Sequence, residues 1–407
     1  MLKLTMSTTV NTTLKGFRDF LPSQMAIRNY VKNICIETFE LFGFQPLETP
    51  TLEYASVLKG KYGEEADKLT YFFQDKGDRQ VGMRYDLTIP TCRVLSSYNL
   101  PLPFKRYQIQ PVWRADNTQK GRYREFVQCD FDTFGIKSPL VDAEIIAVIY
   151  NVLKRLNFKK YKIKINNREL LKNIPNTILQ SIDKIEKIGE NGVINELKEK
   201  GIKSDEIDST LKYIKTVQPD DYLKQVFSCL DSFNIPKEAY VFDPSMIRGL
   251  DYYTGIIFET YVEEPKIGSI TGGGRYDNLI KTLGGPDTPA VGSSIGFERI
   301  IDCILDLNLI PEISNTKTKI MVSNFNQTNK ELELLNLLRD NNIPSTYYFA
   351  LDKLGKQITY ADNLGITYIA IIGENEAKNN TVTLKNLKTK EQKTLNSNQI
   401  IELLSNY

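Results

Sequence analysis

The sequence predicts an α+β protein with a large domain built on an antiparallel sheet and a smaller α/β domain at its C-terminal end. Three observations predict it. Strand-like segments over 104–135 flank a polar turn, as in a long-looped β-hairpin. Residues from about 166 to 236 carry helical patterns rich in Lys, Glu, Ile and Asn, which indicates a helical insertion. From residue 317 onward, strand and helix patterns alternate. We therefore expect one domain over 1–316, with the insertion inside it, and a second over 317–407.

The composition is that of an ordinary globular protein. The chain has 407 residues, of which 41% are hydrophobic and 25% charged, so it can bury a core in each of two domains. No stretch has the length and apolarity of a membrane span, and the N-terminus lacks the apolar core of a signal peptide. Five scattered cysteines without a CxxC pair favour reduced thiols over disulfides or a zinc site. We therefore expect a cytoplasmic protein that does not contact a membrane.

Two features of charge narrow the possible chemistry. The net charge of +2 does not indicate a strongly basic surface for nucleic acid, so any polyanion must be bound by local patches. The sequence contains no histidine, which excludes Ser-His-Asp and Cys-His catalysis and HExxH zinc sites. An enzyme of this composition would act by positioning and electrostatics, with Mg²⁺ held by carboxylates or phosphates.

The first predicted element is a helix that starts at Ser23 and ends at Gly43. One face of it is apolar and carries Val31, Ile34, Cys35 and Phe39. The segment 48–52 that follows is expected to be extended at a sheet edge, because Pro50 cannot sit in a central strand. Helix and strand together fit either core packing or a dimer interface.

Two short strands are expected next, over 71–73 and 81–83, joined by the polar turn 75–78. In the segment 84–90 that follows them, Asp86 and Thr88 alternate with apolar neighbours.

The hairpin over 104–135 carries the residues with the most chemistry. On its outgoing arm the side chains alternate, so that three polar residues share one face: Gln128, Asp130 and Asp132. The incoming arm and the turn add further polar residues: Arg106, Gln108, Gln110, Arg114, Arg122 and Arg124. Guanidinium groups beside carboxylates and an amide suit a zwitterion together with a polyphosphate. An exposed hairpin with surface ion pairs is the alternative, and the spacing alone does not separate the two.

Three glycine-rich clusters follow, after a helix that begins at Ser138-Pro139 and is apolar nearly all round. They cover 246–255, 271–277 and 292–299, and each combines glycine with arginine. Glycine lets the backbone approach a ligand closely. Any one cluster could be a tight turn in a packed sheet, but three together favour a ligand site opposite the hairpin.

The C-terminal part has the alternation of a small α/β domain with a mixed or parallel sheet. Strands are expected over 320–322, 346–349, 368–372 and 382–384. Helices are expected over 330–338, 353–364 and 397–404.

Together these motifs resemble the histidyl-tRNA synthetases, a family of class II aminoacyl-tRNA synthetases, over essentially the whole chain. The hairpin resembles motif 2, residues 48–50 resemble motif 1, and 296–299 resemble motif 3, all of which are shared across class II. Residues 248–253 and 273–277 resemble the histidine-specific signatures. The resemblance implies a class II antiparallel-sheet catalytic domain with a helical insertion and a C-terminal anticodon-binding α/β domain.

The resemblance also implies an activity. A histidine–tRNA ligase activates L-histidine with ATP to histidyl-adenylate and transfers the histidyl group to the 3′-terminal ribose of tRNA(His). Mg²⁺ would be chelated by the phosphates of ATP rather than by dedicated protein ligands, and the protein would be a homodimer. The main alternative is a catalytically inactive, synthetase-like regulatory subunit of ATP phosphoribosyltransferase. A class II synthetase for another amino acid, or a nucleic-acid-binding module without chemistry, are further alternatives.

Residue roles follow from the same resemblance. Arg114 and Arg248 would act in catalysis from opposite sides of the α-phosphate. Histidine would be bound by Asp86, Leu87, Thr88, Arg114, Gln128, Asp132, Arg248, Tyr252, Tyr253 and Tyr276. ATP would be bound by Arg114, Arg122, Phe126 and Arg299.

Overall fold

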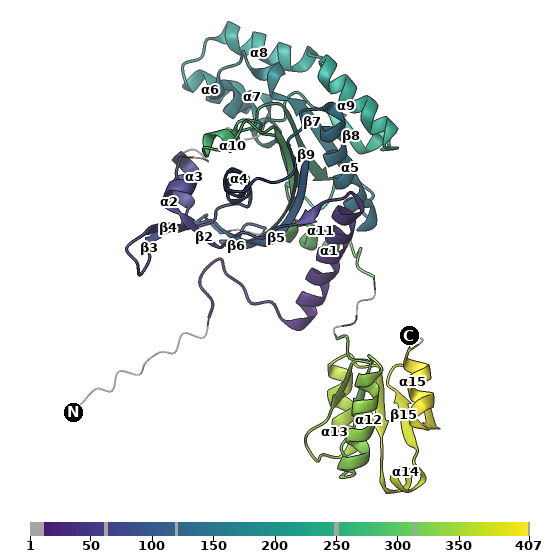
Figure 1. Ribbon diagram of the computed structural model, residues 1–407. Coiled ribbons are helices and arrows are strands. Elements are labelled where there is room, and N and C mark those ends of the chain that lie inside the picture. The colour runs from purple at the N-terminus through teal and green to yellow at the C-terminus, as the bar shows by residue number, and fades with distance from the viewer. Residues whose placement is uncertain are drawn as a thin grey trace, which may run out of the picture. The chain divides into compact units, whose positions relative to one another are not determined.

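The computed structural model describes residues 12–60, 64–118, 121–247, 252–311, 314 and 316–405 (Figure 1). The chain divides into two compact units, a larger one that ends at Ile310 and a smaller one that begins at Pro311 and also includes Phe20–Asn29. Within the described ranges, no helix is both long and apolar enough to cross a membrane.

The larger unit is built on an eight-stranded sheet with the spatial order β1-β5-β6-β11-β10-β9-β7-β8. Neighbouring strands are antiparallel except at the two ends, where β1 runs parallel to β5 and β7 to β8. The strands are β1 (Gln45–Pro46), β5 (Phe104–Trp113), β6 (Glu125–Phe134), β7 (Tyr161–Asn167), β8 (Tyr240–Phe242), β9 (Ile256–Val262), β10 (Ser269–Arg275) and β11 (Ala290–Gly296). The predicted antiparallel sheet is confirmed.

The predicted hairpin is confirmed as β5 and β6, which pair without a shift from Phe104 opposite Phe134 to Trp113 opposite Glu125. On its other side β6 pairs with β11, so the hairpin lies inside the sheet and not at its edge. The alternation places Phe131 in the core below the sheet, where its ring centroid lies 4.8 Å from that of Phe39. Gln128, Asp130 and Asp132 therefore face the opposite side.

A separate three-stranded sheet precedes the hairpin, with β4 (Gln80–Met83) between β2 (Leu52–Tyr54) and β3 (Phe72–Gln74). This confirms the two predicted short strands, and β2 is an edge strand that begins just after Pro50. The alternation seen over 84–90 does not continue as a strand, because α4 begins at Thr88. The carboxylate of Asp86 accepts a hydrogen bond of 3.1 Å from the backbone N–H of Ile89, which satisfies a donor in the first turn.

Seven helices lie outside the stretch between β7 and β8 in the described part of the chain before Ile310. They are α1 (Pro22–Leu41), whose first residues belong to the smaller unit, α2 (Ala55–Leu58), α3 (Glu64–Leu69), α4 (Thr88–Ser97), α5 (Pro139–Arg155), α10 (Leu279–Thr282) and α11 (Phe297–Asp306). α1 begins one residue before the predicted Ser23 and ends two residues before Gly43, and α5 begins at Pro139 as predicted. The Ser138 hydroxyl caps α5 by accepting from the N–H of Leu140 at 3.2 Å. α5 is buried as predicted, although it carries the fully buried charged residue Asp142.

Helices also fill the chain between β7 and β8, where Figure 1 shows them grouped at one end of the larger unit. They are η1 (Arg168–Leu171), α6 (Asn176–Ile182), α7 (Ile185–Glu199), α8 (Ser204–Thr216), α9 (Asp221–Ser232) and η2 (Lys237–Ala239). Their apolar faces form a core of their own, which includes Ile178, Val193 and Leu211. Polar contacts tie them to the rest of the unit: the hydroxyl of Tyr222 donates to Asp142 of α5 at 2.6 Å, and the side-chain amide of Asn167 on β7 donates to Asp220 at 2.7 Å.

The smaller unit has a five-stranded mixed sheet with the order β13-β12-β14-β15-β16. The strands are β12 (Ile320–Val322), β13 (Ser345–Tyr347), β14 (Tyr368–Ile371), β15 (Val382–Asn386) and β16 (Gln392–Leu395). The helices are α12 (Thr328–Asp340), α13 (Leu354–Asn363), α14 (Glu374–Asn379) and α15 (Ser397–Ser405). The predicted strands and helices are confirmed, but β16 and α14 are additional. The sequence carries little signal for them, because β16 is mostly exposed and polar and α14 buries no residue.

A buried ion-pair network joins α5 to the end of β10. Arg275 pairs with Asp142 of α5 and, at 3.0 Å, with Asp277, and both Arg275 and Asp142 are almost completely buried. Burial opposes the charge on Arg275, but the two carboxylates outweigh it and raise the pKa of the guanidinium group. This network fixes the position of the residues that follow β10.

We expect Asp142→Ala to destabilise the larger unit by about 3–5 kcal/mol, because it leaves Arg275 as a buried charge without its main partner. Differential scanning calorimetry of the purified protein should show a clearly lower Tm. Asp287→Ala is the matched control, since Asp287 pairs with Lys281 at 3.6 Å on the surface and should hardly move the Tm. Equal shifts for the two variants would contradict a structural role of the network.

Candidate functional site

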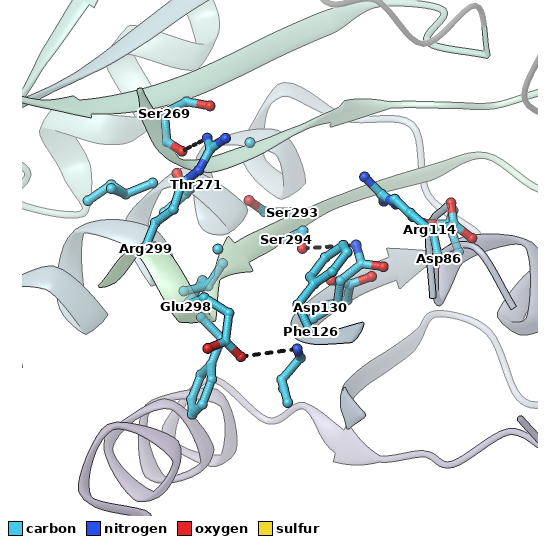
Figure 2. Close-up of a pocket in the computed structure, with 18 of the residues that line it drawn as sticks. Asp86, Arg114, Phe126, Asp130, Ser269, Thr271, Ser293, Ser294, Glu298 and Arg299 are labelled. Atoms are coloured by element: carbon cyan, nitrogen blue, oxygen red, sulfur yellow. Dashed lines mark hydrogen bonds between the residues drawn. The ribbon is translucent and has the colours of Figure 1, made fainter. Parts of the chain in front are cut away.

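A cavity of about 530 Å³ lies over the face of the eight-stranded sheet that carries the polar residues of β6 (Figure 2). β10 and β11 complete its floor, with Thr271, Ser293 and Ser294 among the lining residues. The walls come from the start of α4, from both ends of the hairpin loop and from the start of α11. Segments far apart in the chain thus meet at one concave site.

Most of the predicted site residues line this one cavity: Asp86, Thr88, Arg114, Arg122, Phe126, Gln128, Asp132, Tyr252, Tyr253, Tyr276 and Arg299. Leu87 does not line it, because its side chain is fully buried in the core ahead of α4. Arg248 lies outside the described residues. The structure also adds lining residues that were not among the predicted site residues: Asp116, Asp130, Ser293, Ser294 and Glu298.

One end of the cavity is acidic and rests on a buried ion pair. Asp132 of β6 lies 2.7 Å from Arg106 on β5. The arginine side chain is fully buried, and 5% of the aspartate side chain is exposed. The hydroxyl of Tyr276 donates a hydrogen bond to the other oxygen of Asp132. Burial raises the pKa of Asp132, and both Arg106 and Tyr276 oppose that rise. The carboxylate is therefore held in one orientation by two partners.

A glycine makes room for this carboxylate. Gly292 of β11 lies directly opposite Asp132 in the antiparallel register. A Cβ atom built on Gly292 would lie 1.7 Å from an oxygen of Asp132, so the carboxylate occupies the space that any side chain would need. Position 292 of the glycine cluster must therefore be glycine for steric reasons.

The middle of the floor holds polar atoms without partners. One oxygen of Asp130, the amide oxygen of Gln128 and the hydroxyl of Ser293 are buried and have no hydrogen bond to the described part of the chain. Burial raises the pKa of Asp130 to about 7, while the charge of Arg106 opposes the shift. A buried polar group without a partner costs about 1–3 kcal/mol, which indicates a floor arranged to bind a polar ligand.

Arg114 is held at the cavity wall by aromatic rings. Its guanidinium carbon lies 4.2 Å from the ring centroid of Tyr85 and 5.1 Å from that of Phe126, and its Nε donates to the carbonyl of Tyr85 at 3.0 Å. These contacts leave the planar fork of Arg114 directed at the cavity (Figure 2). A guanidinium group held in this way suits a carboxylate or phosphate.

Arg122 is differently placed. Both of its contacts go to Asp116, through Nε and Nη2 at 3.1 Å each, and half of its side chain is exposed. A ligand phosphate would therefore have to compete with Asp116 for this arginine.

The start of α11 connects the cavity to the N-terminal segment. Glu298 accepts hydrogen bonds from Arg18 at 2.7 Å and from the backbone N–H of Val127 at 3.3 Å. Arg299 donates to the carbonyl of Ser269 at 2.7 Å (Figure 2), and burial lowers the pKa of its guanidinium group. Arg299 is thereby positioned across the cavity from Phe126, where the two could enclose a flat ring.

Comparisons with known proteins agree with this architecture. Residues 16–202 and 191–300 match a family model described as histidyl-tRNA synthetase, and residues 317–407 match one described as an anticodon binding domain. A histidine–tRNA ligase from Clostridium tetani is 37% identical over 97% of this chain and 98% of its own length. One from Rhodopirellula baltica is 38% identical over 93% of this chain and 94% of its own. The crystal structure of histidyl-tRNA synthetase from Nostoc sp. PCC 7120 superposes with a TM-score of 0.83 at 29% identity, over 97% of this chain and 99% of that one.

We expect Gly292→Ala to destabilise the larger unit by about 3–5 kcal/mol, because the added methyl group displaces Asp132 from Arg106 and leaves a buried charge without its partner. Thermal unfolding measured by circular dichroism would detect the lower Tm. Gly77→Ala is the control in the same unit, since its Cβ would meet only side-chain atoms at 3.4 Å or more. An unchanged Tm for Gly292→Ala would mean that Asp132 can move without loss of stability.

Proposed function

The chain belongs to the histidyl-tRNA synthetase family, and from this premise we propose how its residues perform the reaction of a histidine–tRNA ligase. The protein is an aminoacyl-tRNA synthetase that joins L-histidine to tRNA at the expense of ATP. One observation carries the assignment of roles. A single cavity combines an acidic floor around Asp132 with guanidinium groups at Arg114 and Arg299.

The acidic end would bind histidine. Asp132 would accept a hydrogen bond from one ring nitrogen of the imidazole, and Tyr252, Tyr253 and Tyr276 would enclose the ring. Asp86, Thr88 and Gln128 would bind the α-ammonium group, since all three line the same cavity. A pocket that hydrogen-bonds the ring should reject amino acids without it, because buried polar groups would then lose their partners.

The other end would bind ATP. Arg299 and Phe126 would enclose the adenine, and Arg122 would bind the outer phosphates after exchanging its contact with Asp116. Arg114 would bind the α-phosphate and the histidine carboxylate together, so that a carboxylate oxygen attacks the α-phosphorus in line. That P–O bond forms, the bond to the β-phosphate breaks, and pyrophosphate leaves. Fixed positive charge and proximity lower the barrier without a histidine base.

The transfer step needs one proton acceptor. The terminal ribose hydroxyl of the tRNA attacks the carbonyl carbon of the adenylate, AMP leaves, and a phosphate oxygen takes the hydroxyl proton. Mg²⁺ would enter with ATP, whose phosphates supply its ligands while waters complete the shell. Its chemical contribution is to neutralise charge on the polyphosphate. Asp116, a carboxylate of the cavity wall, is engaged with Arg122, so we assign no protein ligand to the ion.

The regulatory-subunit alternative is less well supported. It requires neither the anticodon-binding domain, which residues 317–407 match, nor the arrangement of Arg114 and Arg299 about one cavity. We propose that residues 317–407 contact the anticodon of tRNA(His). We also infer that the protein works in the cytoplasm, because all five of its cysteines are free thiols.

We propose that the protein is a homodimer through the face formed by β2, β4 and the end of α4. A groove of about 750 Å³ lies there, and exposed large hydrophobic side chains line it: Leu52, Tyr54 and Tyr98. Apolar patches of this kind mark protein interfaces. Size-exclusion chromatography with light scattering should give a molar mass twice that of the chain. A molar mass equal to that of one chain would contradict the proposal.

ATP–pyrophosphate exchange, run with each amino acid separately, tests the function. We expect exchange with L-histidine alone. Exchange with proline or threonine but not histidine would overturn the specificity, and exchange with no amino acid would favour the regulatory alternative.

The same assay tests the site. Arg114→Ala should lower kcat by about 10²–10³-fold, the range for losing one preorganised donor to the transition state. Lys224→Ala is the control, because Lys224 is exposed, pairs with Asp221 in the same helix and does not line the cavity. Near-normal exchange by the Arg114 variant would remove this residue from the mechanism.

A further inference from the structure

We propose that Asp130 binds the second ring nitrogen of histidine, so that the imidazole is held as a doubly protonated imidazolium between Asp130 and Asp132. The inference rests on the proposed function and adds a residue and a charge state to the same pocket. Four lines of observation support it: position, free hydrogen-bonding capacity, charge balance and protonation.

The spacing of residues along β6 sets the position of Asp130 relative to Asp132. Asp130 and Asp132 are separated by one residue of β6, both line the cavity, and both are buried. Residues two apart on a strand are about 7 Å apart along it. That is the span of a five-membered ring with a hydrogen bond of about 2.8 Å at each side. The two carboxylates are thus spaced for the two nitrogens of one imidazole.

Asp130 also has a free acceptor. Its side chain is hydrogen-bonded to Ser294, which is uncharged, whereas Asp132 has an ion pair with Arg106 and a hydrogen bond from Tyr276. One oxygen of Asp130 has no hydrogen-bond partner in the described part of the chain, and the nearby hydroxyl of Ser293 has none either. Across the sheet, Asp130 faces Ser294 on β11 and Gln108 on β5, and neither supplies a positive charge. Figure 2 shows Asp130 with Ser293 and Ser294 among the residues that line the cavity.

The charges around Asp130 do not balance without a ligand. The titratable groups that act on Asp130, or on its neighbour Asp132, come from several elements: Asp86 before α4, Arg106 on β5, Asp132 on β6 and Tyr276 after β10. Arg106 offsets Asp132, to which it is paired at 2.7 Å. The α-ammonium group of histidine would offset Asp86. Asp130 is then left without a counter-charge unless the ring carries one.

Protonation is consistent with this arrangement. Burial raises the pKa of Asp130 to about 7, close to the ordinary value of about 6.5 for imidazole. At neutral pH, the carboxyl group of Asp130 and the imidazole of free histidine therefore hold about one proton between them. At higher pH both groups are deprotonated, so formation of the ion pair takes up one proton from solvent. Tyr276 stays neutral, because burial raises its pKa well above the usual range.

The absence of histidine from the chain permits a direct test. In protein prepared without a histidine tag, ¹⁵N-labelled L-histidine supplies the only imidazole in the sample, so NMR reports its ring nitrogens without background. With wild-type protein at pH 8 we expect both bound nitrogens to be protonated. A bound ring with a single N–H would overturn the proposal, and this measurement needs no variant.

Variants then assign the effect to Asp130. With Asp130→Asn, which keeps the shape, we expect a singly protonated ring at pH 8 and at least tenfold weaker binding of L-histidine, with the KM for ATP unchanged. Calorimetric titration in two buffers of different ionisation enthalpy should show proton uptake with wild type and none with the variant. Cys129→Ala is the control, since Cys129 is buried on the opposite face of β6 and should leave both readouts unchanged.

The outcomes separate the two proposals. Wild-type protein that neither binds L-histidine nor supports exchange with it would overturn the function. Wild-type protein that does both, alongside an Asp130→Asn variant with the same ring protonation and the same affinity, would overturn only the role of Asp130. Because the variant could also misfold, Asp130→Ser is a second one, with the unfolding Tm of each recorded.

Discussion

The buried ion pair between Arg106 and Asp132 is the constraint on which the site depends. A guanidinium group with no exposed surface is stable inside a sheet only beside a carboxylate, so Asp132 must stay on the cavity side of β6 at this register. A shift of one residue in the pairing of β5 with β6 would turn the polar face of β6 into the core. The same pair that fixes the register therefore also presents the carboxylate that we assign to the ring of histidine.

A second buried ion pair, between Arg275 and Asp142, helps to hold Asp132 in place. Arg275 is held by Asp142 and Asp277, and the next residue after Arg275, Tyr276, donates to Asp132. Asp142 in turn accepts from Tyr222 in the helices between β7 and β8. These hydrogen bonds and ion pairs, with the peptide bond between Arg275 and Tyr276, connect those helices to the pocket. Each buried charge among these residues has a partner, as the low dielectric of the interior requires.

The floor of the cavity contrasts with these satisfied pairs. Gln128, Asp130 and Ser293 leave polar atoms buried without a partner in the described ranges. The buried charge of Arg275, by contrast, is paired with two carboxylates. These unpaired groups cost free energy in the protein without ligand. A ligand that hydrogen-bonds to them removes this cost, so binding is selective for a ligand with matching polar groups.

The sequence by itself determined the strands of the hairpin, the alternation that puts Gln128, Asp130 and Asp132 on one face, and the α/β pattern after residue 317, because these follow from local periodicity. It did not determine that α4 starts at Thr88, since an alternating pattern of a few residues fits a strand and a helix start equally. Partners far apart in the chain, such as Arg18 with Glu298 and Asp130 with Ser294, exist only once the sheet has assembled. Tertiary structure alone decided the partners, burial and charge balance of Asp130, because desolvation depends on everything packed around a group.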